Sequence, residues 1–193
     1  MTELINFRKI NNFEKSIIIN TLSKIIQDSD LVIERIKDRL YISFDIIFEK
    51  NPYPSIYLLF SDQENLYIKF EANLQITSAG LYFGFLKKET FRISLEGVEY
   101  LTKKEDCFKE QKLVVNSKGE KSVLYGTDIF KEDVLKIPIK LRIGDFLIIL
   151  NLQNEICAIA QSIMDIKTFK DLKPRSKIAL NLVDKGYYLR KKQ

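Results

Sequence analysis

Apolar residues follow a helical spacing in the first part of the chain, between Phe7 and Gln27. Asn11 or Asn12 supplies a side chain suited to capping the first turn of such a helix. The polar residues 28–30 then end the pattern. The apolar positions recur at steps of three to five residues, which predicts one buried helix face: Ile10, Phe13, Ile17, Leu22 and Ile25.

From Leu31 the pattern changes to short runs rich in β-branched and aromatic residues, which are typical of strands. A tight hairpin loop is predicted at residues 62–65, and a helix at Gly97–Cys107 with Val98 and Leu101 on one face. The first part of the chain is therefore predicted to be mixed α/β with a helix at each end. The predicted strands occupy residues 40–48, 55–60, 66–70, 81–86 and 91–95.

The last part of the chain alternates short strands with turns. Turns are predicted at Asn151–Asn154 and at Asp184–Gly186, where Gly186 is expected to take the positive φ that a hairpin turn needs. A short helical stretch is expected at Lys131–Ile137. This rhythm is typical of a small β-barrel with one or two short helices. The predicted strands are Lys112–Asn116, Asp145–Leu150, Ile156–Ser162, Ile178–Val183 and Tyr187–Lys191.

The net charge differs between the two parts of the chain that the strand and helix patterns distinguish. Residues 1–107 hold 14 Lys and Arg against 16 Asp and Glu, whereas residues 108–193 hold 17 against 10. We therefore predict an α+β protein with a near-neutral domain over residues 1–107 and a basic domain over residues 108–193. A basic domain of this size suits a polyanion such as nucleic acid. The chain has no apolar run near the roughly 20 residues of a membrane helix and no signal-peptide pattern at its N-terminus, so we expect a cytoplasmic protein with no membrane partner.

The chain contains no histidine, which removes the commonest general base and metal ligand. Ser-His-Asp catalysis and His-based zinc sites are therefore excluded. Its two cysteines, Cys107 and Cys157, lack metal-ligand spacing and are expected to be buried thiols. We predict no catalytic residue, no metal and no cofactor, hence no enzyme. A small hydrolase with an acidic site is the alternative that the missing histidines leave open.

Four stretches together resemble a known family that pairs a pre-PUA domain with a C-terminal PUA domain. They are residues 84–101, residues 123–131, residues 143–160 and residues 182–190, and their order and spacing agree with the family. Members are factors of large-ribosomal-subunit assembly in archaea and in the eukaryotic nucleolus. The resemblance implies a pre-PUA α+β domain over residues 1–107 and a PUA β-barrel over residues 108–193. Thr127 stands where the family usually has Asn.

The basic segment from Lys167 to Lys177 carries the strongest candidate site. It holds five cations against one acid, Asp171, and three of its lysines recur every third residue. On a helical turn those three lysines would share a face and contact successive phosphates. Phe169 has two interpretations, a stacking surface for an unpaired base or a side chain tucked into the barrel. The five cations are Lys167, Lys170, Lys173, Arg175 and Lys177.

Three further cations complete the predicted RNA-binding set. The resemblance implies that Lys131 and Lys136 meet RNA, because PUA domains use the helix and strand of that region. Arg190 extends the basic surface from the last predicted strand. Two interpretations are open for Tyr125–Asp128, a loop that accepts a phosphate or a strand entry. We favour the entry, in which Gly126 takes a positive φ and Asp128 caps the next turn.

These observations predict an RNA-binding factor. By resemblance, the RNA is precursor rRNA or uridine-rich RNA and the role is ribosome biogenesis or rRNA processing. The domain over residues 1–107 would dock protein partners of ribosome assembly or RNA processing. The alternative is an accessory RNA-binding subunit of a tRNA or rRNA modification system.

Overall fold

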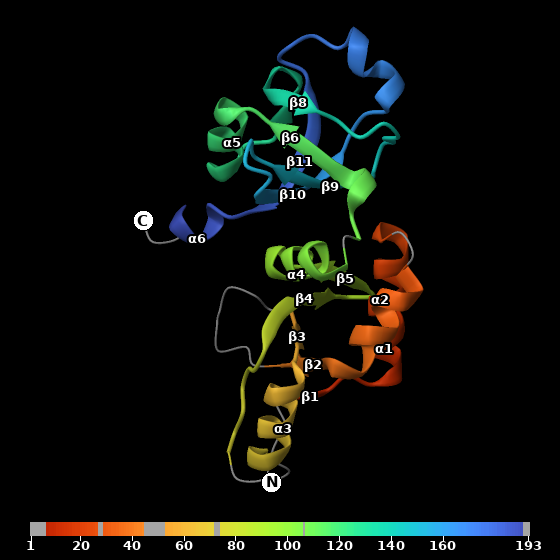
Figure 1. Cartoon of the computed structure of the whole chain (residues 1–193), viewed down its shortest axis with the longest axis vertical. Coiled ribbons are helices and arrows are strands. Elements are labelled where there is room, and N and C mark those ends of the chain that lie inside the picture. The colour runs from red at the N-terminus through yellow and green to blue at the C-terminus, as the bar shows by residue number, and fades with distance from the viewer. Residues whose placement is uncertain (1–6, 27–28, 45–52, 72–73, 106, 191–193) are drawn as a thin grey trace. The chain divides into compact units, whose positions relative to one another are not determined.

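The computed structural model describes residues 7–26, 29–44, 53–71, 74–105 and 107–190. The chain forms two compact units, Met1–Cys107 and Phe108–Gln193 (Figure 1). Each unit has its own sheet, and helices are present in both. The mixed α/β character expected from the sequence is therefore confirmed. Among the described helices, none has the length and apolar content that crossing a membrane requires.

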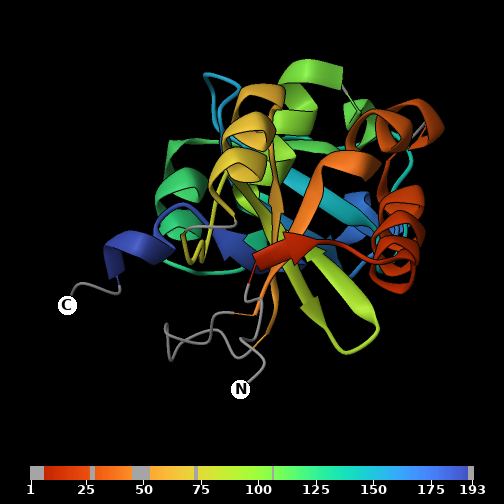
Figure 2. The same cartoon turned by 90° about the horizontal axis from the view of Figure 1, so that it is seen from below.

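The first unit is built on a five-stranded antiparallel sheet with the order β1-β2-β3-β4-β5. Helix α1 contacts α2 and β5, and α4 contacts β4. The β4–β5 hairpin is yellow-green in Figure 2. The strands are β1 (Phe7–Lys9), β2 (Leu40–Ser43), β3 (Ser55–Leu58), β4 (Leu81–Lys87) and β5 (Thr90–Ile93). The helices are α1 (Asn12–Ile25), α2 (Ser29–Ile36), η1 (Lys37–Arg39), α3 (Ser61–Phe70) and α4 (Leu95–Glu105).

The predicted first helix begins five residues later than expected, and Asn11 caps it. The Asn11 side-chain oxygen accepts from the Glu14 backbone N–H at 2.9 Å, and the Glu14 carboxylate accepts from the Asn11 N–H at 2.8 Å. This reciprocal pair satisfies two N–H groups that a helix start leaves without a partner. Phe7–Lys9 instead pairs with β2 as a strand.

Two strand predictions in the first unit are wrong. The chain from Leu31 continues as helix α2, because Val32, Ile33 and Ile36 together form one buried helix face. The predicted loop at 62–65 and strand at 66–70 are both part of α3. Their aromatic and β-branched residues favour strands only where a sheet buries them, and α3 has no buried residue. The part of the predicted strand 40–48 beyond residue 44 lies outside the described residues.

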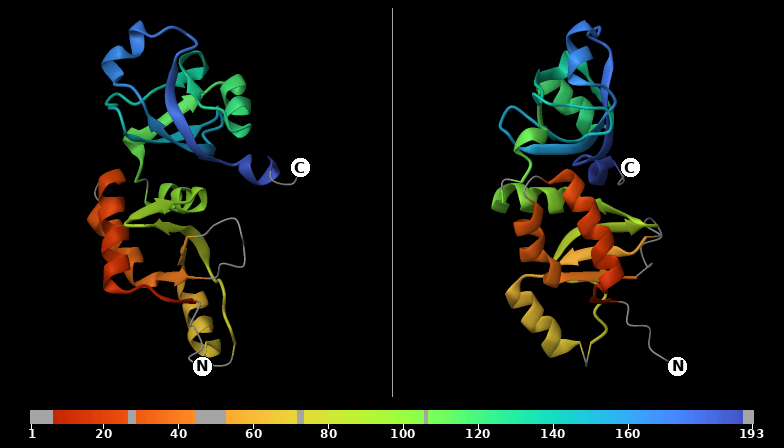
Figure 3. Two further views of the ribbon diagram at one scale, coloured as in Figure 1. Left: turned by 180° about the vertical axis from the view of Figure 1, so that it is seen from behind. Right: turned by 90° about the vertical axis from the view of Figure 1, so that its right-hand side faces the viewer.

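The second unit is a six-stranded sheet that curls into a half-barrel (Figures 1 and 3). Its order is β7-β11-β10-β9-β6-β8, and every pair is antiparallel except the parallel pair of β6 and β9. The strands are β6 (Lys112–Val115), β7 (Ile129–Phe130), β8 (Val134–Lys136), β9 (Phe146–Leu150), β10 (Ile156–Ser162) and β11 (Lys177–Asp184). The helical segments are η2 (Lys109–Gln111), α5 (Ser117–Leu124), η3 (Lys131–Asp133), η4 (Ile166–Asp171) and α6 (Tyr187–Arg190).

The half-barrel closes around an apolar core drawn from several strands and from α5, with Leu113, Val123 and Leu147 among its members. Cys157 belongs to this core, and its burial raises the pKa of the thiol to about 11. Cys107 and Cys157 are both free and buried, so the expectation of two buried thiols is confirmed. A thiol with a raised pKa is a poor nucleophile at neutral pH.

Three predictions for the second unit are corrected. The described part of the predicted strand Tyr187–Lys191 is helix α6, and Gly186 does not take a positive φ. An alanine Cβ at Gly186 would lie 1.8 Å from the Leu124 carbonyl oxygen, so close packing demands glycine there. The stretch Lys131–Ile137 is helical only as far as Asp133 and then forms β8.

Helix α5 was not predicted. Its sequence, Ser117–Leu124, is mostly polar, and only Gly119 and Val123 are buried. Asn116 starts it, because its side-chain oxygen accepts from the Gly119 N–H at 2.8 Å. The turn at Asn151–Asn154 is confirmed by a hydrogen bond from the Asn154 N–H to the Asn151 carbonyl.

Candidate nucleic-acid interface

Four exposed cations lie on and just after η4, the helical segment that joins β10 to β11 (Figure 3). We call Lys167, Lys170, Lys173 and Arg175 the basic edge. A 3₁₀ helix has three residues per turn, so Lys167 and Lys170 lie on one side of η4. Lys173 follows the helix, because Leu172 is already extended. The helical spacing thus aligns two of the three lysines, and a turn carries the third.

The turn at Lys173–Ser176 is fixed by its own chain and by η3. Pro174 occupies the second position, which suits its restricted φ, and the Ser176 N–H donates to the Lys173 carbonyl at 2.9 Å. The Glu132 N–H of η3 donates to the Pro174 carbonyl, also at 2.9 Å. The side chain of Arg175 is exposed beside this contact.

Phe169 and Lys131 face the protein rather than solvent. Phe169 is half-buried and packs against the core of the half-barrel, which favours the second of its two interpretations. The Lys131 ammonium lies 5.4 Å from the centre of the Phe169 ring and donates to two backbone carbonyls. The Lys131 side chain therefore contacts the backbone of the basic edge on the side that faces the domain core.

Lys177 is engaged in an ion pair with Asp128, at 2.6 Å. Burial alone would raise the pKa of Asp128, but hydrogen bonds from Lys177 and from the Asn181 backbone N–H outweigh it and hold that pKa below its usual range. Asp128 accepts the Asn181 N–H at 2.9 Å and so ties the entry of β7 to β11. It does not cap a following turn as predicted.

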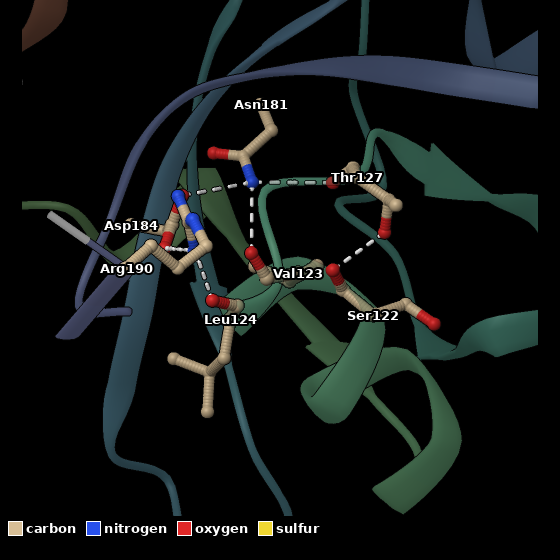
Figure 4. A network of polar contacts seen from close by, with 7 residues as sticks. All are labelled: Ser122, Val123, Leu124, Thr127, Asn181, Asp184 and Arg190. Carbon is tan, nitrogen blue, oxygen red and sulfur yellow. Dashed lines mark hydrogen bonds and ion pairs between the residues drawn. The ribbon is translucent and has the colours of Figure 1, made fainter. Parts of the chain in front are cut away.

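Arg190 is the centre of a polar network at the end of α5 (Figure 4). Its guanidinium donates to both oxygens of Asp184, at 2.8 and 3.0 Å, and to the Leu124 carbonyl. The carboxylate hydrogen bonds raise the pKa of Arg190. Asn181 extends the network by donating to the Val123 carbonyl at 3.0 Å. Arg190 thus fastens α6 to α5, and its donors point into the protein.

The loop after α5 carries the predicted positive φ. Gly126 has φ +87°, which confirms that part of the strand-entry interpretation. The Asn181 amide donates to the Thr127 carbonyl at 3.1 Å, and the Thr127 hydroxyl donates to the Ser122 carbonyl at 2.5 Å (Figure 4). Tyr125 is 76% exposed at the tip. Hydrogen bonds at Thr127 therefore hold the loop against α5 and β11, and one aromatic side chain is open to solvent.

Lys136 is exposed on β8, and two further exposed cations follow it that the sequence analysis missed. Lys140 and Arg142 flank Leu141, whose carbonyl accepts from the Ile166 N–H at the start of η4, at 2.9 Å. This contact brings the two cations to the Lys167 end of the basic edge. The alternation of cationic and apolar residues from Lys136 to Ile143 was the available signal.

The described residues hold no group of three acidic or cysteine side chains placed to bind a metal ion. Within them the basic edge and its neighbours form no ion pair: Lys136, Lys140, Arg142, Lys167, Lys170, Lys173 and Arg175. Arg175 is close enough to Glu132 to help lower the pKa of that carboxyl, but it forms no ion pair with it. Cations outside ion pairs keep their charge available to a polyanion. The surface is suited to holding phosphates.

The Asp128 pair makes the stability of this domain depend on pH in a testable way. A carboxyl with a lowered folded-state pKa stabilises the fold above its ordinary pKa of about 3.9, and this stabilisation is lost as the pH falls through the lower folded value. We expect Asp128→Asn to lose less stability than the original chain between pH 7 and pH 3. Chemical denaturation at both pH values measures this. Equal losses of stability in the original chain and in Asp128→Asn would contradict this expectation. Lys177→Met, which removes the other half of the ion pair, should also lose less stability than the original chain over this pH range.

Comparisons with known proteins agree with this architecture. Residues 111–193 match the family described as UPF0113 PUA domain. No curated protein sequence matches the chain. Among solved structures, the chain is similar to a conserved PUA domain protein from Thermoplasma acidophilum. The two are 16% identical, the similarity covers 96% of this chain and 98% of the other, and the TM-score is 0.61.

Two other archaeal structures have the same fold. A hypothetical protein from Pyrococcus horikoshii OT3 is 16% identical, with 95% of this chain and 98% of the other covered and a TM-score of 0.63. A PUA domain from Aeropyrum pernix K1, in complex with tartrate, is 11% identical, with 93% and 86% covered and a TM-score of 0.63. PUA is a known RNA-binding fold, so the family match supports RNA binding. Together these findings support a PUA-containing protein whose PUA domain is the half-barrel of the C-terminal unit.

Proposed function

We propose that this chain is an RNA-binding factor of ribosome assembly that holds RNA along the basic edge of its PUA domain. The observation that carries the proposal is the set of exposed cations on η4 and the following turn, none of which forms an ion pair among the described residues. Lysine and arginine side chains bind phosphates and displace the counterions around a nucleic acid. Backbone hydrogen bonds hold the turn that carries Lys173 and Arg175.

We expect the chain to bind RNA without catalysing a reaction. Its sequence has no histidine, and the raised pKa of Cys157 keeps that thiol protonated at neutral pH. Binding therefore depends on charge and shape, with no metal or cofactor. The near-neutral first unit is the half that would dock proteins of ribosome assembly or RNA processing. Exposed apolar residues of α3, among them Leu66 and Ile68, suit such a contact.

Salt dependence tests the phosphate contacts. With a labelled single-stranded uridine-rich RNA and the full chain, four contacts predict a slope of about −3 for log affinity against log salt, since each contributes roughly −0.7 on a single strand. Fluorescence anisotropy from low to moderate salt measures the slope. An affinity that does not change with salt would contradict a basic-edge interface and favour stacking, for which Tyr125 is the exposed candidate.

The ribosomal role needs a cellular experiment. Crosslinking the tagged protein in cells and sequencing the bound RNA should recover precursor rRNA of the large subunit. Enrichment of tRNA in its place would support the accessory subunit of a modification system and would overturn the ribosomal assignment while leaving RNA binding in place.

A further inference from the structure

The Lys131 ammonium forms contacts within the protein, whereas the lysines of the basic edge are exposed to solvent. Its ammonium donates to the backbone carbonyls of Lys170 at 2.8 Å and of Leu172 at 2.5 Å. It also lies 5.4 Å from the centre of the Phe169 ring, within the range of a cation–π contact. An ammonium has three N–H donors, and two of them point at these carbonyls. Little hydrogen-bonding capacity is left for a phosphate.

These two carbonyls lie at the end of η4, where a helix leaves its last C=O groups without internal partners. Lys131 supplies those partners from η3, across a sequence separation of 39 residues for Lys170 and 41 for Leu172. Its own backbone N–H donates to the Ser176 carbonyl at 2.9 Å. The side chain and the backbone of one residue thus hold the segment that carries Lys170, Lys173 and Arg175 on both sides of Pro174.

We infer that Lys131 is a positioning residue of the RNA interface: it orders the basic edge from within and does not itself bind RNA. The consequence for RNA binding rests on the proposed function. A backbone that is already ordered loses less conformational freedom when RNA binds, and such pre-organisation strengthens binding without adding a contact. The same contacts pack Phe169 against the core and fix where η4 ends.

The order of the segment is tested without RNA. Lys131→Met keeps an unbranched side chain over the Phe169 ring but removes the ammonium donors. Amide hydrogen exchange across residues 167–173 is expected to speed up by at least threefold in this variant, and trypsin should cleave faster after Lys167 and Lys170. The matched control is Lys136→Met, which removes an exposed lysine that forms no hydrogen bond or ion pair with η4 within the described part of the chain. Unchanged exchange and cleavage in Lys131→Met would overturn the inference.

A double-mutant cycle tests the route by which Lys131 affects RNA. Lys131→Met alone should weaken binding of the labelled single-stranded RNA by about threefold to tenfold. In a chain in which Lys167, Lys170 and Lys173 are already alanine, the same change should have a much smaller effect, because Arg175 is then the one cation of the basic edge left for Lys131 to position. Lys136→Met should change the RNA affinity by the same factor in that background as in the original chain. A full additional loss from Lys131→Met would make Lys131 a direct RNA ligand and overturn the inference.

Two results separate this inference from the proposed function. If the triple alanine variant binds RNA like the original chain, the basic edge is not the interface and the proposed function fails at this site. Hydrogen exchange in Lys131→Met still decides whether Lys131 orders η4. If Lys131→Met does not fold, Lys131→Gln replaces it: its shorter, neutral side chain cannot serve both carbonyls, so exchange at residues 167–173 should still speed up, and unchanged exchange would overturn the inference.

Discussion

Changing Lys167, Lys170 and Lys173 together to alanine is expected to weaken RNA binding by ~30-fold at low salt. Three cations would no longer displace counterions, so the slope of log affinity against log salt should become shallower by about 2 on single-stranded RNA. The melting temperature should hardly change, because exposed substitutions usually alter stability by less than about 0.5 kcal/mol each. Anisotropy titrations and thermal melting of one preparation measure both quantities.

The control removes three exposed lysines from the first unit. Lys24, Lys103 and Lys104 lie at the ends of α1 and α4, and their change to alanine lowers the net charge by the same amount. If this control weakens binding as much as the first variant does, the effect belongs to overall charge and not to the basic edge. A folded basic-edge variant with undiminished affinity would move the site to Lys136, Lys140 and Arg142.

Gly186→Ala is expected to destabilise the PUA domain by about 3 kcal/mol, at the upper end of what an overpacked site costs. The added Cβ would lie 1.8 Å from the Leu124 carbonyl oxygen and 2.8 Å from the Arg190 Nη1 atom. Neither the end of α5 nor the Arg190 guanidinium can move away without breaking the bonds that dock α6. Denaturant unfolding followed by a probe in the second unit measures the loss.

Gly144→Ala is the matched control for that substitution. Gly144 has φ +89°, but an alanine Cβ there would meet no atom within 4 Å. Its cost should be limited to backbone strain, on the order of 1 kcal/mol. If both variants lose the same stability, crowding at Gly186 is not what fixes α6.

The sequence predicted strands well where a strand lies inside a sheet and is paired on both sides. Strand β10 was predicted with the bounds that it has, Ile156–Ser162, and β4 differs by one residue. The failures lie where local composition and environment disagree. Helix α3 has aromatic and β-branched residues but no sheet neighbour to pair with, and α6 was taken for a strand because its Tyr-Tyr-Leu run has strand character.

The candidate site was only partly accessible from sequence. The basic segment after Lys167 was visible as a run of cations, and its role in RNA binding stays a prediction. The contacts of Lys131 with Lys170 and of Arg190 with Leu124 were not visible, because these partners lie 39 and 66 residues away along the chain. Asp184 lies only six residues from Arg190, but it was assigned to a hairpin turn that leads into a strand. A count of charges treats every lysine and arginine alike. The fold separates cations that bond to groups of the protein itself from exposed cations that can contact a ligand.

The open half-barrel has a consequence for self-association. Its sheet ends at β7, with two residues, and at β8, with three. An unpaired strand edge is a template on which another molecule can add a strand, and short edges limit the number of hydrogen bonds that such an addition forms. Lys136 on β8 adds charge at one of these edges. We therefore expect the sheet to stay open without recruiting further strands, so that the domain resists aggregation at concentrations where long flat edges would promote it.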